Sequence, residues 1–250
     1  MKKWKGIVLA GGLGTRLRSV VADRPKVLAE VGKKPFLTYV LDQLVQVGIR
    51  HVVICIGYLG EQVRKYFGDR YGPLELEYSH EDEPMGTGGA LRLGLSTLRT
   101  DHVLVMNGDS ICVSDLGEFW NWHQGKGSKA SILLVRCSDV SRYGKVEVDH
   151  NGIITEFVEK QEKRGPGWIS AGAYLIARSW IQDIPVGRFV SIEREIFPSW
   201  VGRGIYGFQS KGRLLDIGTP DSYALAEAFL LKKVRVCSFG GKGLSLIHIS

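Results

Sequence analysis

Short apolar runs alternate along the first half of the chain with longer segments of helical period. Four runs have the length and composition of buried strands: residues 7–10, 52–56, 74–78 and 103–106. Between them, apolar side chains recur every three or four residues in three segments typical of helices: residues 36–47, 60–67 and 88–98. Gly48 follows the first of these segments and predicts its end. Strands alternating with helices indicate βαβ units and a mainly parallel sheet.

The second half of the chain changes character. Three strand-like runs occur there: ILLVR at 132–136, KVEVD at 145–149 and IITEFVE at 153–159. HNG separates the last two, and an Asn-Gly pair between β-like runs is a strong hairpin signal. We therefore expect a small antiparallel element to join the sheet. Further segments complete the pattern: a strand at 172–177, a helix at 192–200, a strand at 214–217 and a helix at 220–233.

Composition and run length limit the class of protein. Of 250 residues, 44% are hydrophobic and 24% charged, which is typical of a globular chain with a full core. The longest apolar runs fall far below the roughly 18 residues that span a bilayer, and the N-terminus lacks an export signal. We expect one α/β domain over residues 1–237, cytoplasmic and without a membrane partner. Residues 238–250 show no amphipathic period and are predicted to be a disordered or foreign tail.

Cysteine spacing and charge narrow the function further. Neither a CxxC pair nor a histidine at zinc-finger spacing accompanies the cysteines at positions 55, 112, 137 and 237, so we expect reduced thiols. The formal net charge of +7 suits an anionic ligand. Basic residues are spread along the chain with acidic residues between them, and no nucleic-acid-binding motif accompanies them. A nucleic-acid partner is therefore not expected.

The loop GGLGTRLRSVVADRPK at 11–26 follows the first strand directly. Its glycines let the backbone approach an anion, and its cations add positive charge: Gly11, Gly12, Gly14, Arg16, Arg18, Arg24 and Lys26. Such a loop suits a triphosphate. It is neither the P-loop, which needs GxxxxGK[ST], nor the dinucleotide fingerprint, which needs a third glycine where Leu17 stands. On spacing alone, an ordinary glycine-rich turn remains the alternative.

A series of ordered motifs resembles the sugar-1-phosphate nucleotidyltransferase family. GGxGTRL with a nearby PK is similar to its phosphate-loop signature, EDEPMGTGGAL to its base-reading loop, and NGD to its metal-binding turn. YGKVEVD, VEK, SAGAYL and DIGTPDSY resemble later family segments. The match runs from about residue 6 to residue 233. It implies a glycosyltransferase-A-like, Rossmann-like α/β fold, a Mg2+ cofactor and, in many members, a homo-oligomer.

The resemblance implies a reaction in which a sugar 1-phosphate attacks the α-phosphorus of a nucleoside triphosphate and pyrophosphate leaves in line. A phosphate oxygen is already anionic at neutral pH, so no Ser, Cys or His nucleophile and no general base is required. Charge neutralisation and alignment then dominate catalysis. The absence of an obvious Ser-His-Asp or Cys-His constellation fits this reaction.

Two aspartates stand where strands end in turns. Asp109 follows a strand and an Asn-Gly pair, and Asp216 precedes a Gly-Thr-Pro turn. The carboxyl edge of an α/β sheet is where such folds bind ligands, so the two carboxylates make a candidate Mg2+ site. Without the resemblance, two turn-capping aspartates would be the simpler interpretation.

The resemblance also implies the other site residues. Catalytic roles are expected for Arg16, Lys26, Asp109 and Lys160. The nucleotide is expected to contact Leu9, Ala10, Gly11, Gly12, Gly14, Thr15, Arg16, Glu81, Gly86, Thr87, Gly88 and Asp109. The sugar phosphate is expected to contact Tyr143, Gly144, Glu159, Lys160, Ser170 and Gly172. The plain alternatives are solvated loop cations, an exposed Glu-Lys pair and a helix N-terminus capped by Thr87.

The similarity also bears on the substrates. RLRSVVADRPKVLAEVGKKPFLTYVLDQL, IGYLGEQV and SIEREIFP look closer to the heptose-phosphate guanylyltransferases than to thymidylyl or uridylyl relatives. We therefore expect GTP and a manno-configured sugar 1-phosphate, with D-glycero-D-manno-heptose 1-phosphate ahead of mannose 1-phosphate. Thymidylyl or uridylyl transfer to a hexose 1-phosphate is the alternative reaction. A non-catalytic nucleotide-sugar-binding regulatory subunit is the alternative from another class, although it could have lost the charged residues that this chain retains.

Overall fold

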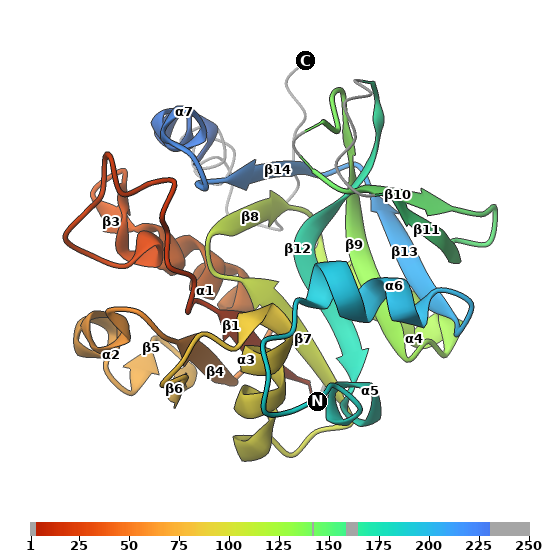
Figure 1. The fold of residues 1–250 in the computed structure, drawn as a ribbon, viewed down its shortest axis with the longest axis horizontal. Coiled ribbons are helices and arrows are strands. Elements are labelled where there is room, and N and C mark those ends of the chain that lie inside the picture. The colour runs from red at the N-terminus through yellow and green to blue at the C-terminus, as the bar shows by residue number, and fades with distance from the viewer. Residues whose placement is uncertain (1–3, 142, 159–164, 231–250) are drawn as a thin grey trace, which may run out of the picture.

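The computed structural model describes residues 4–141, 143–158 and 165–230. Glu159, Lys160 and the predicted tail at 238–250 lie outside these residues. Helices flank a central ten-stranded sheet, as Figure 1 shows. The predicted α/β class, with a mixed and mainly parallel sheet, is confirmed. Within the described ranges, every helix is too short or too polar to cross a bilayer.

Four strands form the parallel half of the sheet, and they are the four that the apolar runs predict: β1 (Lys5–Leu9), β4 (His51–Ile56), β6 (Leu74–His80) and β7 (His102–Asn107). They lie in the order β7-β1-β4-β6, and each neighbouring pair is parallel. Their carboxyl ends therefore share one edge of the sheet. At that edge the Gly108 N–H donates to the Leu9 carbonyl at 2.8 Å, which ties the loop after β7 to the loop after β1.

The other half of the sheet is mostly antiparallel. It contains β9 (Ala130–Cys137), β10 (Lys145–Val148), β11 (Ile154–Val158), β12 (Gly167–Ala177) and β13 (Ile205–Ser210). The short strand β5 (Arg70–Tyr71) lies at the opposite end of the sheet, antiparallel to β6. The long strand β12 pairs with β9 along one edge and with β10 and then β7 along the other, so it joins the two halves. The predicted hairpin is confirmed, because β10 and β11 are antiparallel and Gly152 adopts a φ of 82° in the turn between them.

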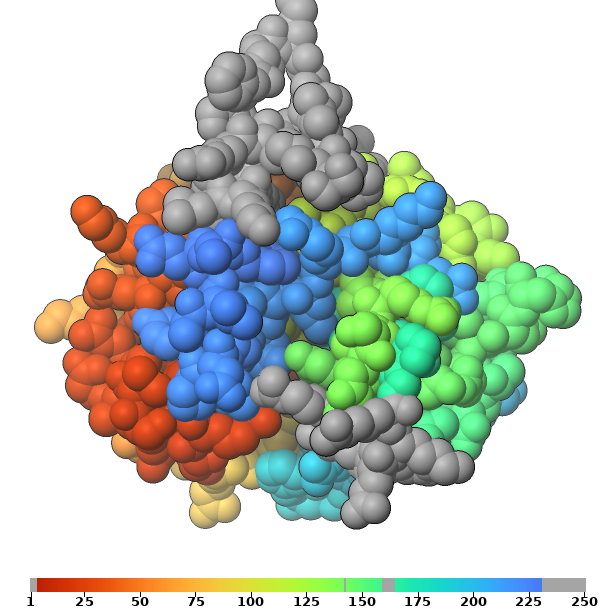
Figure 2. Space-filling view, turned by 90° about the horizontal axis from the view of Figure 1, so that it is seen from above, coloured from red at the N-terminus to blue at the C-terminus, as the bar shows by residue number. Residues whose placement is uncertain are grey.

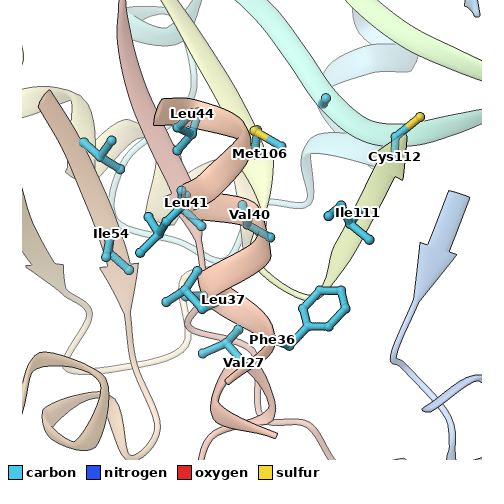
Figure 3. Close-up of a cluster of buried hydrophobic side chains, with 14 of the residues drawn as sticks. Val27, Phe36, Leu37, Val40, Leu41, Leu44, Ile54, Met106, Ile111 and Cys112 are labelled. Carbon is cyan, nitrogen blue, oxygen red and sulfur yellow. The ribbon is translucent and has the colours of Figure 1, made fainter. Parts of the chain in front are cut away.

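Both faces of the parallel strands are covered by helices. Alternate residues of β1, β4 and β7 belong to two different apolar clusters, as expected when successive side chains point to opposite faces. The helix α1 (Phe36–Gln46) packs on one face, where Leu37, Leu41 and Leu44 meet Ile54 (Figure 3). On the other face lie α3 (Gly86–Gly94) and the 3-10 turn at Leu95–Thr97. Neither face of these strands contacts water, so their sequences are almost continuously apolar.

The remaining elements surround this core. They are a 3-10 turn at Lys26–Leu28, β2 (Glu30–Val31), β3 (Lys34–Pro35), α2 (Gly60–Phe67), β8 (Ser110–Val113), α4 (Leu116–Lys126), α5 (Arg178–Gln182), a π-helix at Ile192–Ile196, α6 (Phe197–Trp200), β14 (Arg213–Asp216) and α7 (Pro220–Ala224). The helix predicted at 192–200 is thus a π-helical turn that continues into α6. The strand predicted at 214–217 pairs with β8 in a separate two-stranded sheet. The last helix begins at 220 as predicted, and residues 231–233 of the prediction lie outside the described residues.

A buried histidine makes stability depend on pH at the edge of the sheet opposite the carboxyl ends. His123 is fully buried, its Nδ1 lies 2.8 Å from the Ser131 hydroxyl, and the His102 ring packs against it. Desolvation, with a smaller contribution from His102, lowers the pKa of His123 to about 4. Its pKa in the unfolded chain is about 6.5, so the unfolded chain binds the proton first as the pH falls.

We expect the free energy of unfolding to fall by about 2 kcal/mol between pH 7 and pH 5 through this histidine alone. The contribution is present above pH 6.5 and is lost as the pH falls toward 4. Urea unfolding at both pH values, with His123→Asn as the non-titrating comparison, measures it. Equal pH dependence in the two proteins would contradict the prediction.

Candidate active site

The phosphate loop, residues 10–26, leaves the carboxyl end of β1. The Ala10 N–H still donates to a carbonyl of β4 at 2.8 Å, so the loop begins as a continuation of the sheet. It turns at Gly14, whose φ of 61° favours glycine, and it is anchored by the buried side chain of Leu17. Arg16 and most of the neighbouring residues are exposed. The loop therefore presents a cation and backbone groups to solvent at the ligand-binding edge of the fold.

The C-terminal end of the loop is braced by other parts of the chain. Arg24 pairs with Asp23 and with Glu30, each at 3.0 Å. The Glu30 carbonyl in turn accepts a hydrogen bond from the Tyr223 hydroxyl of α7 at 2.5 Å. Figure 2 shows the blue segment that contains β14 and α7 lying against the red and orange segment that contains the loop. Arg24 is thus engaged within the protein, whereas Arg16 has an exposed side chain.

Four predicted residues from distant parts of the chain converge beside Gly218. Lys26 Nζ lies 2.6 Å from Asp109 Oδ2, and the lysine side chain is only 12% exposed. A methyl group at Gly218 would lie 3.3 Å from the Arg16 guanidinium and 3.4 Å from Lys26 Nζ, and it would collide with Asp216 Oδ1. The fold therefore brings two cations and two carboxylates to one place.

Pairing of β8 with β14 causes this convergence. Asp216 is the register partner of Ser110, and the Ile217 N–H donates to the Asp109 carbonyl at 3.0 Å. Both oxygens of Asp216 accept hydrogen bonds: Oδ1 from the Gly218 N–H at 2.6 Å and Oδ2 from the Tyr143 hydroxyl at 3.2 Å. Tyr143, which the sequence assigns to the sugar phosphate, thus contacts the predicted metal ligand.

The donor set suits a hard cation. Mg2+ commonly binds one or two carboxylates and completes its octahedron with water and phosphate oxygens. Asp109 and Asp216 offer such oxygens on neighbouring backbone segments. In the part of the chain that the structure describes, no three His, Cys, Asp or Glu side chains gather closely enough to hold a metal by themselves. Substrate phosphates would therefore have to supply further ligands.

The base loop, residues 81–88, places a carboxylate against the phosphate loop. Glu81 Oε2 accepts from the Met85 N–H at 3.0 Å. Its Oε1 lies so close to Gly11 and Gly57 that a methyl group on either glycine would overlap it. Desolvation raises the pKa of Glu81, while the bond from Met85 opposes the shift. Glycine at positions 11 and 57 therefore makes room for an acidic side chain at the start of the nucleotide site.

The glycines of the base loop have a structural role that the sequence did not predict. Gly86 adopts a φ of 72°, and a side chain there would collide with the Val190 carbonyl. The Gly88 N–H donates to the same carbonyl at 2.8 Å, so it is already used within the protein. Thr87 does not cap α3, because its hydroxyl donates to Glu193 Oε2 at 2.8 Å. Val190 lies outside the motifs, and Glu193 lies within SIEREIFP, to which the sequence analysis had assigned no site role.

The predicted sugar-phosphate residues of β12 lie beside the metal turn, residues 107–110. Gly172 has a φ of 72°, and a methyl group there would lie 2.6 Å from Ser110 Oγ and 3.1 Å from Asn107 Nδ2. The register of β12 against β9 shifts between Ser170 and Tyr174, which is where Gly172 sits. Gly144 is exposed on the loop before β10. Ser110 Oγ and Asn107 Oδ1 are buried and have no hydrogen-bond partner among the described residues.

The chemistry that these groups can perform is electrostatic. The two cations can align and neutralise a polyphosphate, and the two carboxylates could contribute by holding a metal ion. Cys55, a nucleophile type near the base loop, is fully buried, and desolvation raises its pKa to about 12. A buried thiol of this kind is not an activated nucleophile. The arrangement favours in-line transfer between phosphates over covalent catalysis by the protein.

Comparison with known proteins agrees with this geometry. The family model described as nucleotidyl transferase matches residues 5–233. A mannose-1-phosphate guanylyltransferase from Mycobacterium tuberculosis is 34% identical over 248 residues, which cover 97% of this chain and 69% of that protein. A D-glycero-alpha-D-manno-heptose 1-phosphate guanylyltransferase from Aneurinibacillus thermoaerophilus is 33% identical over 224 residues, which cover 89% of this chain and 96% of that protein.

Solved structures with the same fold point the same way. HddC from Yersinia pseudotuberculosis, in its complex with GMP-PN, superposes with a TM-score of 0.80 at 31% sequence identity. The superposition covers 90% of this chain and 99% of that one. The prediction of a sugar-1-phosphate nucleotidyltransferase is confirmed: the chain belongs to the nucleotidyl transferase family.

Proposed function

We propose that the enzyme transfers a guanylyl group from GTP to a manno-configured sugar 1-phosphate and releases pyrophosphate. D-glycero-D-manno-heptose 1-phosphate is the preferred acceptor and mannose 1-phosphate the second. The observation that carries the proposal is the half-buried Glu81 carboxylate between Gly11 and Gly57, beside the phosphate loop. Relatives named for both acceptors, at 33% and 34% identity, support it.

The choice of base follows from hydrogen-bonding direction. An ionised carboxylate only accepts hydrogen bonds. Guanine presents two adjacent donors on its pairing edge, the N1–H and the exocyclic amino group, which match the two oxygens of a carboxylate. Uracil and thymine place a single N–H between two carbonyls, and adenine places an acceptor beside its amino group. Glu81 therefore favours guanine, and partial burial strengthens the discrimination.

The phosphate chemistry rests on the cluster beside Gly218. Arg16 and Lys26 neutralise the phosphate chain and the charge that builds on the departing pyrophosphate, and the sugar-phosphate oxygen attacks without a protein base. Asp109 and Asp216 would hold Mg2+, which supplies further charge neutralisation when bound. Lys160 and Glu159, just beyond the end of β11, are proposed to bind the sugar phosphate and the sugar hydroxyls.

The sugar is proposed to lie beside β12 and the metal turn. These segments pack closely at Gly172, where a side chain would collide with Ser110 Oγ, and Asn107 and Ser110 each have a buried side-chain oxygen without a partner among the described residues. Buried polar atoms without partners are costly, so hydroxyl groups of a bound sugar would stabilise them. Residues 1–237 are proposed to form the catalytic unit, acting in the cytoplasm and assembling as a homo-oligomer as many family members do.

A competition assay tests the substrate assignment. The protein receives Mg2+, equal concentrations of GTP, ATP, UTP, CTP and dTTP, and either a heptose or a hexose 1-phosphate. We expect the mass spectrum of the products to be dominated by the GDP-sugar, with the heptose consumed faster than mannose. A dTDP-sugar or UDP-sugar as main product would replace guanylyl transfer by the alternative reaction. Absence of any product would favour a non-catalytic nucleotide-sugar-binding subunit.

A further inference from the structure

Residues 190–193, here called the anchor segment, hold the base loop through four hydrogen bonds. The Val190 carbonyl accepts from the Gly88 N–H at 2.8 Å, and the Val190 N–H donates to the Met85 carbonyl at 2.9 Å. The Ile192 N–H donates to the Thr87 hydroxyl at 2.9 Å, and that hydroxyl donates to Glu193 Oε2 at 2.8 Å. The Thr87 hydroxyl thus accepts one hydrogen bond, from Ile192, and donates its own proton to Glu193.

The second oxygen of Glu193 reaches toward the metal turn. Glu193 Oε1 accepts from the Tyr174 hydroxyl at 3.4 Å. The Asn107 side chain hydrogen-bonds the same hydroxyl, and Asn107 lies two residues before Asp109. The Ser170 hydroxyl lies 3.4 Å from it as well. One carboxylate therefore connects the base loop, the metal turn and the sugar-binding strand.

The tyrosine in this chain is a rigid link. Tyr174 is only 1% exposed, its backbone pairs with Val105 of β7, and its ring packs against Phe197 at a centroid distance of 4.9 Å. Burial and the Glu193 charge raise its pKa well above the ordinary value, so the hydroxyl keeps its proton and can donate it to Glu193. The Tyr174 side chain therefore cannot move without disturbing the packing of the core.

The charge of Glu193 is balanced by hydroxyl groups. Among the described residues, no cationic side chain lies within 4.0 Å of it, and the hydroxyls of Thr87, Tyr174 and Ser191 donate to its oxygens. Glu195, on the same π-helix, differs: it pairs with Arg188 at 2.7 Å and accepts from the Ser191 N–H. Three neutral donors, and not an ion pair, therefore hold the Glu193 carboxylate among the described residues. π-helical turns often occur at functional sites.

From these contacts we propose that Glu193 is a positioning residue, which fixes the base loop relative to the metal turn so that the bound nucleotide presents its α-phosphate to Asp109. The proposal rests on the guanylyl-transfer function and adds a residue that acts through Thr87 and Tyr174 without touching the substrate. Nucleotide affinity depends on each loop by itself, whereas turnover depends on their relative placement. A displacement of about 1 Å can reduce turnover by up to about 100-fold.

The test compares Glu193→Gln with Glu195→Gln, a matched control on the same π-helix. We expect Glu193→Gln to lower kcat by at least about tenfold, to leave the Kd for GTP within about threefold and to leave the unfolding midpoint nearly unchanged. Glu195→Gln should leave kcat within about twofold. Tyr174→Phe should lower kcat similarly, and the double variant should be no worse than either single one, because the two residues form one link.

Hydrogen exchange provides a readout that needs no turnover. In the free protein, Glu193→Gln should speed exchange in the peptides that cover residues 85–91 and 105–112, and Glu195→Gln should not. If the parent protein makes no nucleotide sugar but the exchange result holds, the guanylyl-transfer function fails and the link stands. Unchanged exchange in both peptides, or an unchanged kcat in Glu193→Gln, would overturn the positioning role. A raised KM for GTP with normal kcat would also overturn it, because it would show a binding contact only.

Discussion

We expect Asp109→Asn to lower turnover by at least about 100-fold while leaving the fold intact. The carboxylate faces Lys26 Nζ at 2.6 Å and shares its surroundings with Arg16 and Asp216, so it belongs to the charge arrangement that holds a polyphosphate. An amide keeps the size of the side chain but loses the charge, which removes a proposed metal ligand and leaves Lys26 without its counter-ion. We expect Asp216→Asn to produce a loss of the same order.

Steady-state kinetics at saturating Mg2+, with unfolding midpoints measured in parallel, tests both substitutions. Asp183→Asn is the control, because its side chain is exposed at the end of α5, far from the cluster in sequence and structure. Raising the Mg2+ concentration should restore part of the activity if metal affinity is what is lost. Near-normal turnover in either aspartate variant would remove that carboxylate from the proposed metal site.

We expect Glu81→Gln to lower kcat/KM for GTP by at least about 100-fold and to narrow the proposed preference for GTP over the other triphosphates. The amide turns one acceptor into a donor, which then faces a donor on guanine and leaves a buried group unpaired. The glutamine oxygen can still accept from the Met85 N–H, so the loop should keep its shape. The kinetic constants for all five triphosphates, measured separately, give the preference.

Acid should mimic this substitution. Burial raises the pKa of Glu81, so its carboxylate becomes protonated at a higher pH than an exposed glutamate and loses its acceptor character there. The KM for GTP should therefore rise as the pH falls, and this rise should be absent in Glu81→Gln. Glu83→Gln, two residues away and exposed, is the control. An unchanged preference for GTP in Glu81→Gln would assign base selection to another group.

Three of the predicted strands are buried on both faces. β1, β4 and β7 lie between two helical layers, so most of their positions are apolar and the runs stand out in the sequence. The elements that were missed include α4, β8 and β13. α4 buries few of its residues, and its polar face conceals the helical period, although Asp115 at its start and Gly127 at its end are ordinary capping residues. β8 and β13 are short strands whose partners are distant in sequence.

The site shows the same division. Sequence motifs allowed four site residues to be predicted: Arg16, Lys26, Asp109 and Asp216. The structure then brings these residues close together. Their mutual placement could not be predicted, since it depends on register across β8 and β14. Glu193 could not be found either: its partners lie about 20 and 106 residues away, and no local spacing marks such a link. The roles of the predicted residues in catalysis remain predictions until the variants are measured.

The strand β14 has a consequence for the order in which the enzyme matures. Chains emerge from the ribosome with the N-terminus first, and the parallel core, the phosphate loop and Asp109 all precede residue 110. Asp216 reaches them only after about 100 further residues have been made, and the Tyr223 hydroxyl that braces the loop through Glu30 comes later still. A nascent chain that stops before β14 would carry the nucleotide-binding half without the second carboxylate. If the proposed metal site is correct, competence for transfer is therefore acquired only after β14 has been made and has paired with β8.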